Sequence, residues 1–413
     1  MKLRGTLPFI MAFHPIEADP LALLPIFDPA FKADPHPLYD ALRADGGVCR
    51  MRLPSGTTAW LATSHDAARR LLADKRLSKE QRSRTPLFDH LLTTDPPRHT
   101  GLRRAIAPHF TRTSLMALAP AVRARARTLL DRLPHEGAFD LLAGFAAPLA
   151  FGVVCDLVGV PERSRLAVAR ALDALERAEF EAPERIDAIA RRLSSILKAL
   201  SNRTTGEEGA TSLLATLACA RKGGSIGSDD VAALSFVVLA AGRETTANLI
   251  ANGMLRLLAS TPNAWRDACR SAQQAESVVD ELLRLESPLE MATARHALEA
   301  IEIDGVVIEQ GDLVFVCLAA ANRDPTVFAQ PDALDPSEGR SKGHLAFGHG
   351  VHRCIGAALA RMEACIALAA LADRFPDLRL DMPAAEVAAS WKPGLISRGL
   401  CRLRVTSAAR TAS

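Results

Sequence analysis

Apolar residues recur three and four positions apart along most of this chain, which restricts the folds open to it. Segments with this spacing include AARRLLAD, AVRARARTLLDRL and IDAIARRLSSILKAL, and prolines and glycines separate them. Strand patterns are confined to two regions, residues 49–53 with 59–63 and residues 301–318, where Asp304 and Gly305 mark a tight hairpin turn. The sequence therefore predicts a mainly α protein with small β-sheets.

Composition narrows the class of protein further. With 413 residues, of which 48% are hydrophobic, the chain can bury a large core. Its 50 Lys and Arg nearly balance 47 Asp and Glu, so we expect no nucleic-acid or membrane partner. The apolar run 231–242 is too short to span a bilayer, and the 8 cysteines form no CxxC pair. We expect a cytoplasmic monomer, with residues 1–413 as one domain and 1–30 as an N-terminal arm.

One cysteine has an unusual setting, in the segment FGHGVHRCIG. A strongly helical stretch follows Cys354, so we expect its thiol at a helix N-terminus, where free N–H groups and the helix dipole lower its pKa. Gly348, Gly350 and Gly356 allow a positive φ and a close approach of the backbone to a flat, bulky ligand. Phe347 is placed to cover one side of the sulfur. A thiolate under a large planar ligand suggests haem.

Two other interpretations of this cysteine have to be weighed. A single Cys ahead of a helix is usually a buried, inert residue. A thiolate of low pKa also suits nucleophilic catalysis, for which His349 and His352 are candidate bases. The glycines before the sulfur and the apolar helix after it favour a cofactor face over a nucleophile.

The same segment is similar to the haem-binding motif of the cytochrome P-450 family, F-x-x-G-x-H-x-C-x-G. The matching residues are Phe347, Gly350, His352, Cys354 and Gly356. The resemblance implies a haem-thiolate monooxygenase in which haem b lies between a long central helix and the helix after the cysteine. Cys354 is then the proximal iron ligand, whose electron donation favours O–O cleavage.

Further upstream, AGRETT at 241–246 resembles the family's oxygen-binding stretch, inside a long predicted helix that begins near Ser228. A Gly and a Thr in mid-helix are locally costly, but the Thr245 hydroxyl can bond back to the Ala241 carbonyl and open a groove for dioxygen. The resemblance implies that Glu244 and Thr245 relay protons to the oxygen. Without the cysteine motif, a solvated Glu and a packed Thr would be the simpler interpretation.

Glu281 and Arg284 carry opposite charges three positions apart. On an exposed helix this is an ordinary surface pair, which contributes roughly 0.2–0.5 kcal/mol. By its place among the motifs it resembles the family's E-x-x-R pair, a structural pair that ties its helix to the loop before the cysteine. Leu334 and Glu338 stand where the family usually has an aromatic residue and an arginine. Only Arg340 is nearby, so the third partner stays open.

Two segments, 95–104 and 293–297, supply basic residues in the order that the family has them. Haem carries two propionates, and a buried carboxylate needs cationic or hydrogen-bonding partners. By resemblance, these partners are His99, Arg103, Arg295 and His352. Any one of them alone would be read as a surface charge.

The unfused form of the chain resembles bacterial members that take electrons from NAD(P)H through a ferredoxin reductase and a ferredoxin. We expect a basic proximal face for an acidic ferredoxin. Its arginines are Arg103, Arg104, Arg112, Arg353 and Arg361. Arg243 is an unusually polar residue beside the oxygen-binding stretch, and its partner, whether substrate or protein, stays open.

By family position the substrate pocket is largely apolar, which implies a hydrophobic small molecule. It draws on the loop 80–94, the helices 165–205, and Phe236, Val237, Ala240, Leu289, Met291, Ala292, Leu395 and Ile396. The AGRETT helix most resembles members that hydroxylate or epoxidise macrolides and other polyketides in secondary metabolism. Two alternatives stay open. One is a peroxide-driven peroxygenase, which would not need the Glu244–Thr245 relay, and the other is a haem-binding module without oxygen activation.

Overall fold

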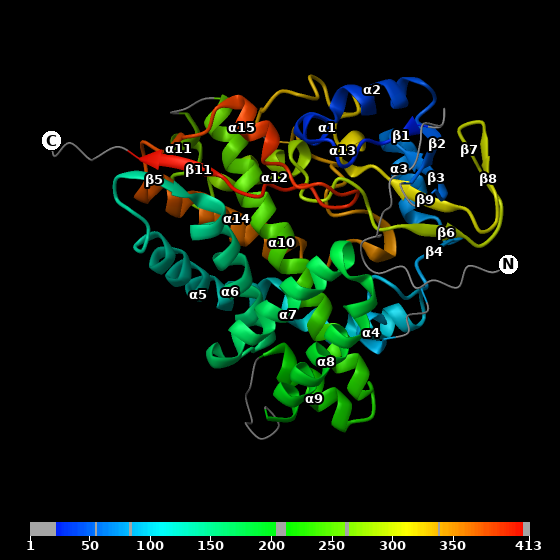
Figure 1. Ribbon diagram of the computed structural model, residues 1–413, viewed down its shortest axis with the longest axis horizontal. Helices are drawn as coiled ribbons and strands as arrows, with labels where there is room; N and C mark the ends of the chain where they lie inside the picture. The colour runs from blue at the N-terminus through cyan, green and yellow to red at the C-terminus, as the bar shows by residue number, and fades with distance from the viewer. Residues whose placement is uncertain are drawn as a thin grey trace.

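The computed structural model describes residues 22–53, 56–81, 85–203, 212–260, 264–337 and 339–407. Most of the expected N-terminal arm, part of the loop 80–94, the end of the segment 165–205 and Glu338 lie outside these residues. The described chain is mainly helical with small sheets, as the spacing of apolar residues predicts (Figure 1). That residues 1–413 form a single domain stays a prediction.

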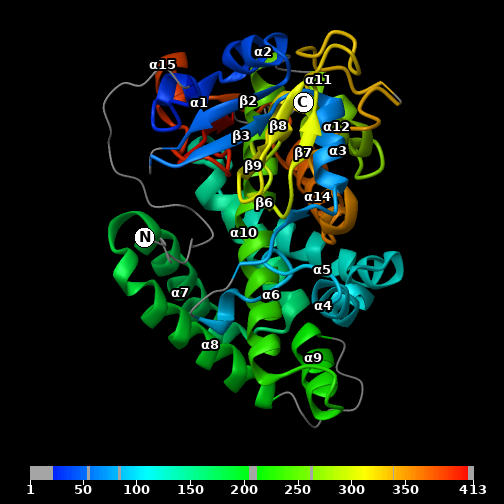
Figure 2. The same cartoon turned by 90° about the vertical axis from the view of Figure 1, so that its right-hand side faces the viewer.

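The longest helix, α10 (Ser228–Ser260), runs through the middle of the molecule (Figure 2). It begins at the predicted residue. Every residue from 231 to 239 and from 246 to 255 is buried, so this helix needs neighbours on all sides. They include α6 (Ala147–Val158), α8 (Ile186–Arg203), α12 (Ala275–Leu285) and α14 (Ala357–Arg374).

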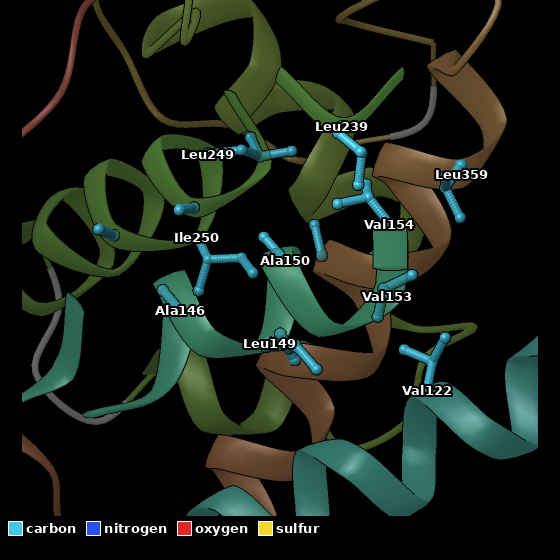
Figure 3. Close-up of a cluster of buried hydrophobic side chains, with 14 of the residues drawn as sticks. Val122, Ala146, Leu149, Ala150, Val153, Val154, Leu239, Leu249, Ile250 and Leu359 are labelled. Atoms are coloured by element: carbon cyan, nitrogen blue, oxygen red, sulfur yellow. The ribbon is translucent and has the colours of Figure 1, made fainter. Parts of the chain in front are cut away.

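The most extensive contact between two helices of the core is that of α10 with α6 (Figure 3). Leu149, Ala150, Val153 and Val154 of α6 meet side chains of α10, α14 and α5 (Arg112–Leu130), namely Leu239, Leu249, Ile250, Leu359 and Val122. A Cβ on Gly242 would overlap the Val154 side chain. The glycine of AGRETT therefore lets two helices approach closely, a packing role that its sequence setting did not reveal.

The remaining helices surround this core. They are α1 (Pro29–Ala33), α2 (His36–Ala44), α3 (His65–Ala73), α4 (Arg98–Ile106), α7 (Glu162–Glu181), α9 (Leu213–Lys222), α11 (Ala264–Ala268), α13 (Leu318–Ala321) and α15 (Ala384–Ala389). Figure 2 shows α7, α8 and α9 around the lower end of α10, with the largest sheet at its upper end.

The largest sheet has 6 strands in the order β1-β2-β3-β9-β6-β4. They are β1 (Ala22–Leu23), β2 (Val48–Arg52), β3 (Thr58–Ala62), β9 (Leu313–Val316), β6 (Arg295–Ala297) and β4 (Leu77–Ser78). β2 and β3 pair antiparallel, which confirms the strands expected there. β5 (Gly137–Asp140), β10 (Arg379–Leu380) and β11 (Arg404–Ser407) form a second sheet.

The predicted hairpin is β7 (Ile301–Ile303) with β8 (Val306–Ile308). Asp304 and Gly305 have φ of 49° and 81°, the positive values that a tight two-residue turn needs at both central positions. Among the described residues, no single helix is long and apolar enough to cross a membrane. One pair, 142–158 and 162–178, meets the length and composition together but is bent by 116°.

Candidate active site

The Cys354 loop joins a 3₁₀ turn, Gly350–His352, to α14, whose N-cap is Gly356. The helix expected after the cysteine is therefore confirmed. The Cys354 N–H donates to the Phe347 carbonyl at 2.9 Å and closes the loop. The Arg361 guanidinium lies 4.6 Å from the Phe347 ring centroid, which fixes the ring at the base of the loop.

The three glycines of this loop differ in what they do. Gly348 and Gly350 have φ of 67° and 75°, where glycine is favoured. A Cβ on Gly350 would lie 2.7 Å from the Leu72 carbonyl oxygen, so this glycine lets the loop pass against the end of α3. A Cβ on Gly348 would meet no atom within 4 Å. Gly356 has φ of −81° and does not use the freedom expected of it.

Burial raises the pKa of the Cys354 thiol. The N–H of Gly356 and the charges of Arg103, Arg353 and Arg361 offset burial only in part, so the expected lowering of this pKa is wrong for the chain alone. The thiol is enclosed by protein and yet retains accessible surface, so it faces an interior space. A thiol of raised pKa is a poor free nucleophile, but metal coordination deprotonates a thiol outright.

The α10 residues 240–245 are partly accessible, although the runs on both sides of them are buried. The Thr245 hydroxyl donates to the Ala241 carbonyl at 2.6 Å, which confirms the expected bond. The helix continues through this turn without a break. Over these residues, neighbouring side chains therefore do not fully cover the central helix.

The Glu244 carboxylate points to the C-terminal segment. One of its oxygens accepts hydrogen bonds from Lys392 Nζ and Ser397 Oγ, each at 3.2 Å. Ser397 Oγ in turn accepts from Asn248 Nδ2 at 3.2 Å. The Lys392 side chain is 39% exposed, so this ion pair links α10 to the surface.

The partner of Arg243 is the protein itself. Its guanidinium pairs with Asp173 and Glu176, one turn apart on α7. Burial alone would lower the pKa of Arg243, but the two carboxylates outweigh it and raise the pKa. The ion pairs therefore tie α7 to the helix that carries Glu244 and Thr245.

Glu281 and Arg284 of α12 are both fully buried and form a bidentate pair at 2.6 and 2.9 Å. Arg284 also donates to the carbonyls of Asn322, Pro331 and Ala333. The third partner is therefore backbone of the loop that precedes the cysteine, and Arg340 pairs instead with Asp335.

The four expected propionate partners lie close to one another. The rings of His99 and His352 are 4.3 Å apart, and His352 Nε2 lies 3.4 Å from Asp95. Burial lowers the pKa of His352 to about 3, with the charges of Lys79, His99 and Arg295 adding to it. The charge of Arg103 acts on both His99 and Cys354, so Arg103 lies close to each of them.

These residues fit haem. The thiol supplies an iron ligand, and the accessible turn of α10 belongs to a helix that packs against α14. His352 Nδ1 is enclosed and has no partner among the described residues, and the buried Arg295 has no carboxylate at ion-pair distance there. A buried cation without a counter-ion and a buried polar atom without a partner both suit a site for carboxylates. The residues that would hold haem are Cys354, Phe347, Gly348, Gly356, His99, Arg103, Arg295 and His352.

The expected pocket residues come from two adjoining regions. Phe236 and Val237 are buried on α10, and the Phe236 ring packs on Phe88 and His90. Leu289 forms an antiparallel β-bridge with Ser397, which brings residues 289–292 close to residues 395–396. Leu289, Ala240 and Ile396 are partly accessible, whereas Met291, Ala292 and Leu395 are buried. Their contact with substrate stays a prediction.

Sequence reasoning missed three residues of this region. Lys79 and Asp95 lie among the expected propionate partners, and Lys392 pairs with Glu244. Asp95 stands in the segment 95–104, which follows the family's order, but only the fold shows the partners of Asp95 and Lys392. Nothing in the local pattern around Lys79 distinguishes it from a surface lysine.

Fold and site together define a haem-thiolate protein. A family model for cytochrome P450 matches residues 171–382. "Cytochrome P450 monooxygenase PikC" of Streptomyces venezuelae is 40% identical, covering 91% of each chain. "20-oxo-5-O-mycaminosyltylactone 23-monooxygenase" of Streptomyces fradiae is 37% identical, covering 85% of this chain and 84% of that one. The structure of the tirandamycin C-bound P450 monooxygenase TamI has a TM-score of 0.82 at 34% identity. This match covers 94% of this chain and 100% of that one.

The chain belongs to the cytochrome P450 family. It is a monooxygenase that binds haem, inserts oxygen into a small molecule and depends on a redox partner for electrons. Neither alternative, a peroxygenase or a haem module without oxygen activation, gains support from these relatives.

Proposed function

We propose that this monooxygenase hydroxylates or epoxidises a hydrophobic polyketide, of the macrolide kind, in secondary metabolism. The observation that carries the proposal is the apolar wall of Phe236 and Val237, one turn ahead of the accessible stretch that ends at Thr245. The name of the Streptomyces fradiae relative supports the substrate class, because it specifies a lactone that carries a mycaminosyl group.

Within this proposal, haem held by Cys354 would supply the chemistry of dioxygen activation, and the chain would supply protons. The Thr245 O–H donates a hydrogen bond to the Ala241 carbonyl, so the lone pairs of the hydroxyl are left to act as acceptors. Glu244 takes protons from the surface through Lys392 and passes them toward Thr245. The side chains of His99, Arg103, Arg295 and His352 hold the propionates, and the Glu281–Arg284 pair fixes the loop before Cys354.

The electron donor in this proposal is an acidic ferredoxin, itself reduced by NAD(P)H through a ferredoxin reductase. Support comes from Arg104, Arg112 and Arg353, which are exposed, and from the charges of Arg103 and Arg353, which act on the Cys354 thiol. We further propose that the protein works as a cytoplasmic monomer.

The test measures product formed per NADPH consumed with a surrogate ferredoxin system and 20-oxo-5-O-mycaminosyltylactone as first substrate. Thr245→Ala should lower this ratio at least about threefold and release the missing electrons as hydrogen peroxide, because proton delivery fails. Thr245→Ser keeps the hydroxyl and should retain most of the coupling. Equal coupling in all three proteins would refute the relay, and failure of every lactone tried would refute the substrate class.

A further inference from the structure

Lys79 follows β4 directly and is only 3% exposed. β4 pairs antiparallel with β6, Leu77 opposite Ala297 and Ser78 opposite His296. One further step of this register sets Lys79 opposite Arg295, which is 5% exposed. Residues directly opposite on antiparallel strands place their side chains on the same face of the sheet. Two buried cations therefore face each other.

Only one described carboxylate, Asp95, acts on the charges of these two cations. Asp95 already accepts from the Ser78 hydroxyl and from the Lys79 backbone N–H, the latter at 3.2 Å, and it faces His352. It forms no ion pair with either cation. The one described side-chain bond of Arg295 is a long one, 3.4 Å, to the Thr293 carbonyl.

The arrangement is costly for the protein chain alone. Burial lowers the pKa of Lys79 well below its usual range and that of Arg295 to about 10. Like charges directly opposite across a strand pair are destabilising, and buried charges normally have a counter-ion. An anion placed between the two side chains would remove both penalties.

We propose that Lys79 is a haem-binding residue, whose ammonium holds one propionate jointly with the Arg295 guanidinium. The planar guanidinium binds a carboxylate through two parallel bonds, and the ammonium adds a point charge from the neighbouring strand. Asp95 positions Lys79 by holding its backbone N–H. The inference rests on haem binding by the chain and not on the substrate proposed above.

The experiment compares four holoproteins: wild type, Lys79→Met, Lys79→Arg and Lys75→Met. Lys75 is an exposed lysine four positions earlier and serves as the matched control. The first measurement is the rate of haem transfer from the ferric protein to excess apomyoglobin. Lys79→Met should lose haem about tenfold faster, because a charge-assisted bond is removed. Lys79→Arg should stay within about threefold of wild type, and Lys75→Met should match it.

The second measurement is the resonance Raman spectrum, in which the propionate bending bands should shift in Lys79→Met and not in Lys75→Met. A merely structural lysine would not move these bands. Should Lys79→Met fail to fold, Lys79→Gln removes the charge while keeping polar atoms, and the same two results are expected of it.

Wild-type haem loss and unshifted bands in Lys79→Met would overturn the proposal. It would also be overturned if the substitution weakened only the binding of an acidic substrate, because the anion would then be the substrate carboxylate. The thiolate assignment is checked separately, since the carbon monoxide complex of each reduced variant should keep the Soret position of the wild type. A wild-type complex that lacks the strongly red-shifted Soret band would refute the thiolate and leave the Lys79 result to stand.

Discussion

Glu281 and Arg284 are both enclosed, so neither can lose its partner without leaving a charge inside the protein. We predict that Glu281→Gln lowers the free energy of unfolding of the holoprotein by about 3–5 kcal/mol, the usual cost of breaking a buried pair. Urea unfolding followed by circular dichroism measures the change. Glu276→Gln, at an exposed position of the same helix, should stay within about 0.5 kcal/mol of wild type.

A cost for Glu281→Gln no larger than that of Glu276→Gln would contradict the structural role of the pair. From the sequence alone, this pair would be assigned the small stabilisation of an exposed ion pair, because three-residue spacing says nothing about burial. Its place among the motifs suggested the correct setting, and the structure adds the backbone carbonyls that complete it.

Single residues show where sequence reasoning succeeds and where it stops. The Thr245 bond to Ala241 follows from spacing along one helix and was predictable. The Lys392 bond to Glu244 joins residues far apart in the chain, so no local pattern could reveal it. The Cys354 thiol was expected to have a lowered pKa from its helix terminus, but burial, which the sequence does not state, has the larger effect.

Among the elements, α7 is tied by a single arginine, Arg243, to the helix that carries Glu244 and Thr245. α7 packs mainly on α8, and Arg243 of α10 reaches across to Asp173 and Glu176. These ion pairs indicate that Arg243 stabilises the docked position of α7.

We predict that Arg243→Leu increases amide hydrogen exchange in α7 about threefold or more, because the helix opens more often without the ion pairs. Mass spectrometry of peptides from the holoprotein measures this exchange. Arg177→Leu, at an exposed position of α7 itself, is the control and should leave the exchange unchanged. Protection of α7 that survives in Arg243→Leu would show that the pairs do not hold the helix.

Elements with strong local patterns were predictable, and those that depend on distant partners were not. α10, α14 and the β7–β8 hairpin follow from apolar spacing and turn residues. β1, β4 and β10 have 2 residues each and exist only through pairing with other strands. The parallel pairing of β3 with β9 joins strands more than two hundred residues apart, which only the complete fold determines.

At the level of the molecule, the proximal arginines should steer an acidic ferredoxin. We predict that the rate of reduction by ferredoxin falls steeply with added salt, because screening weakens attraction between exposed charges. Arg112→Glu should slow reduction about tenfold at low salt, and Arg185→Glu, between α7 and α8, should not. Stopped-flow measurement of reduction under carbon monoxide gives the rates. A salt-independent rate would count against the basic docking face.

Thiolate ligation by Cys354 is the central claim, because oxygen activation depends on it. The direct measurement is the absorption spectrum of the dithionite-reduced protein with carbon monoxide, recorded beside Cys354→Ser. A strongly red-shifted Soret band in the wild type, lost in the variant, is the predicted result. A haem-loaded wild type without that band, or a variant that keeps it, would contradict the assignment of Cys354 as the iron ligand.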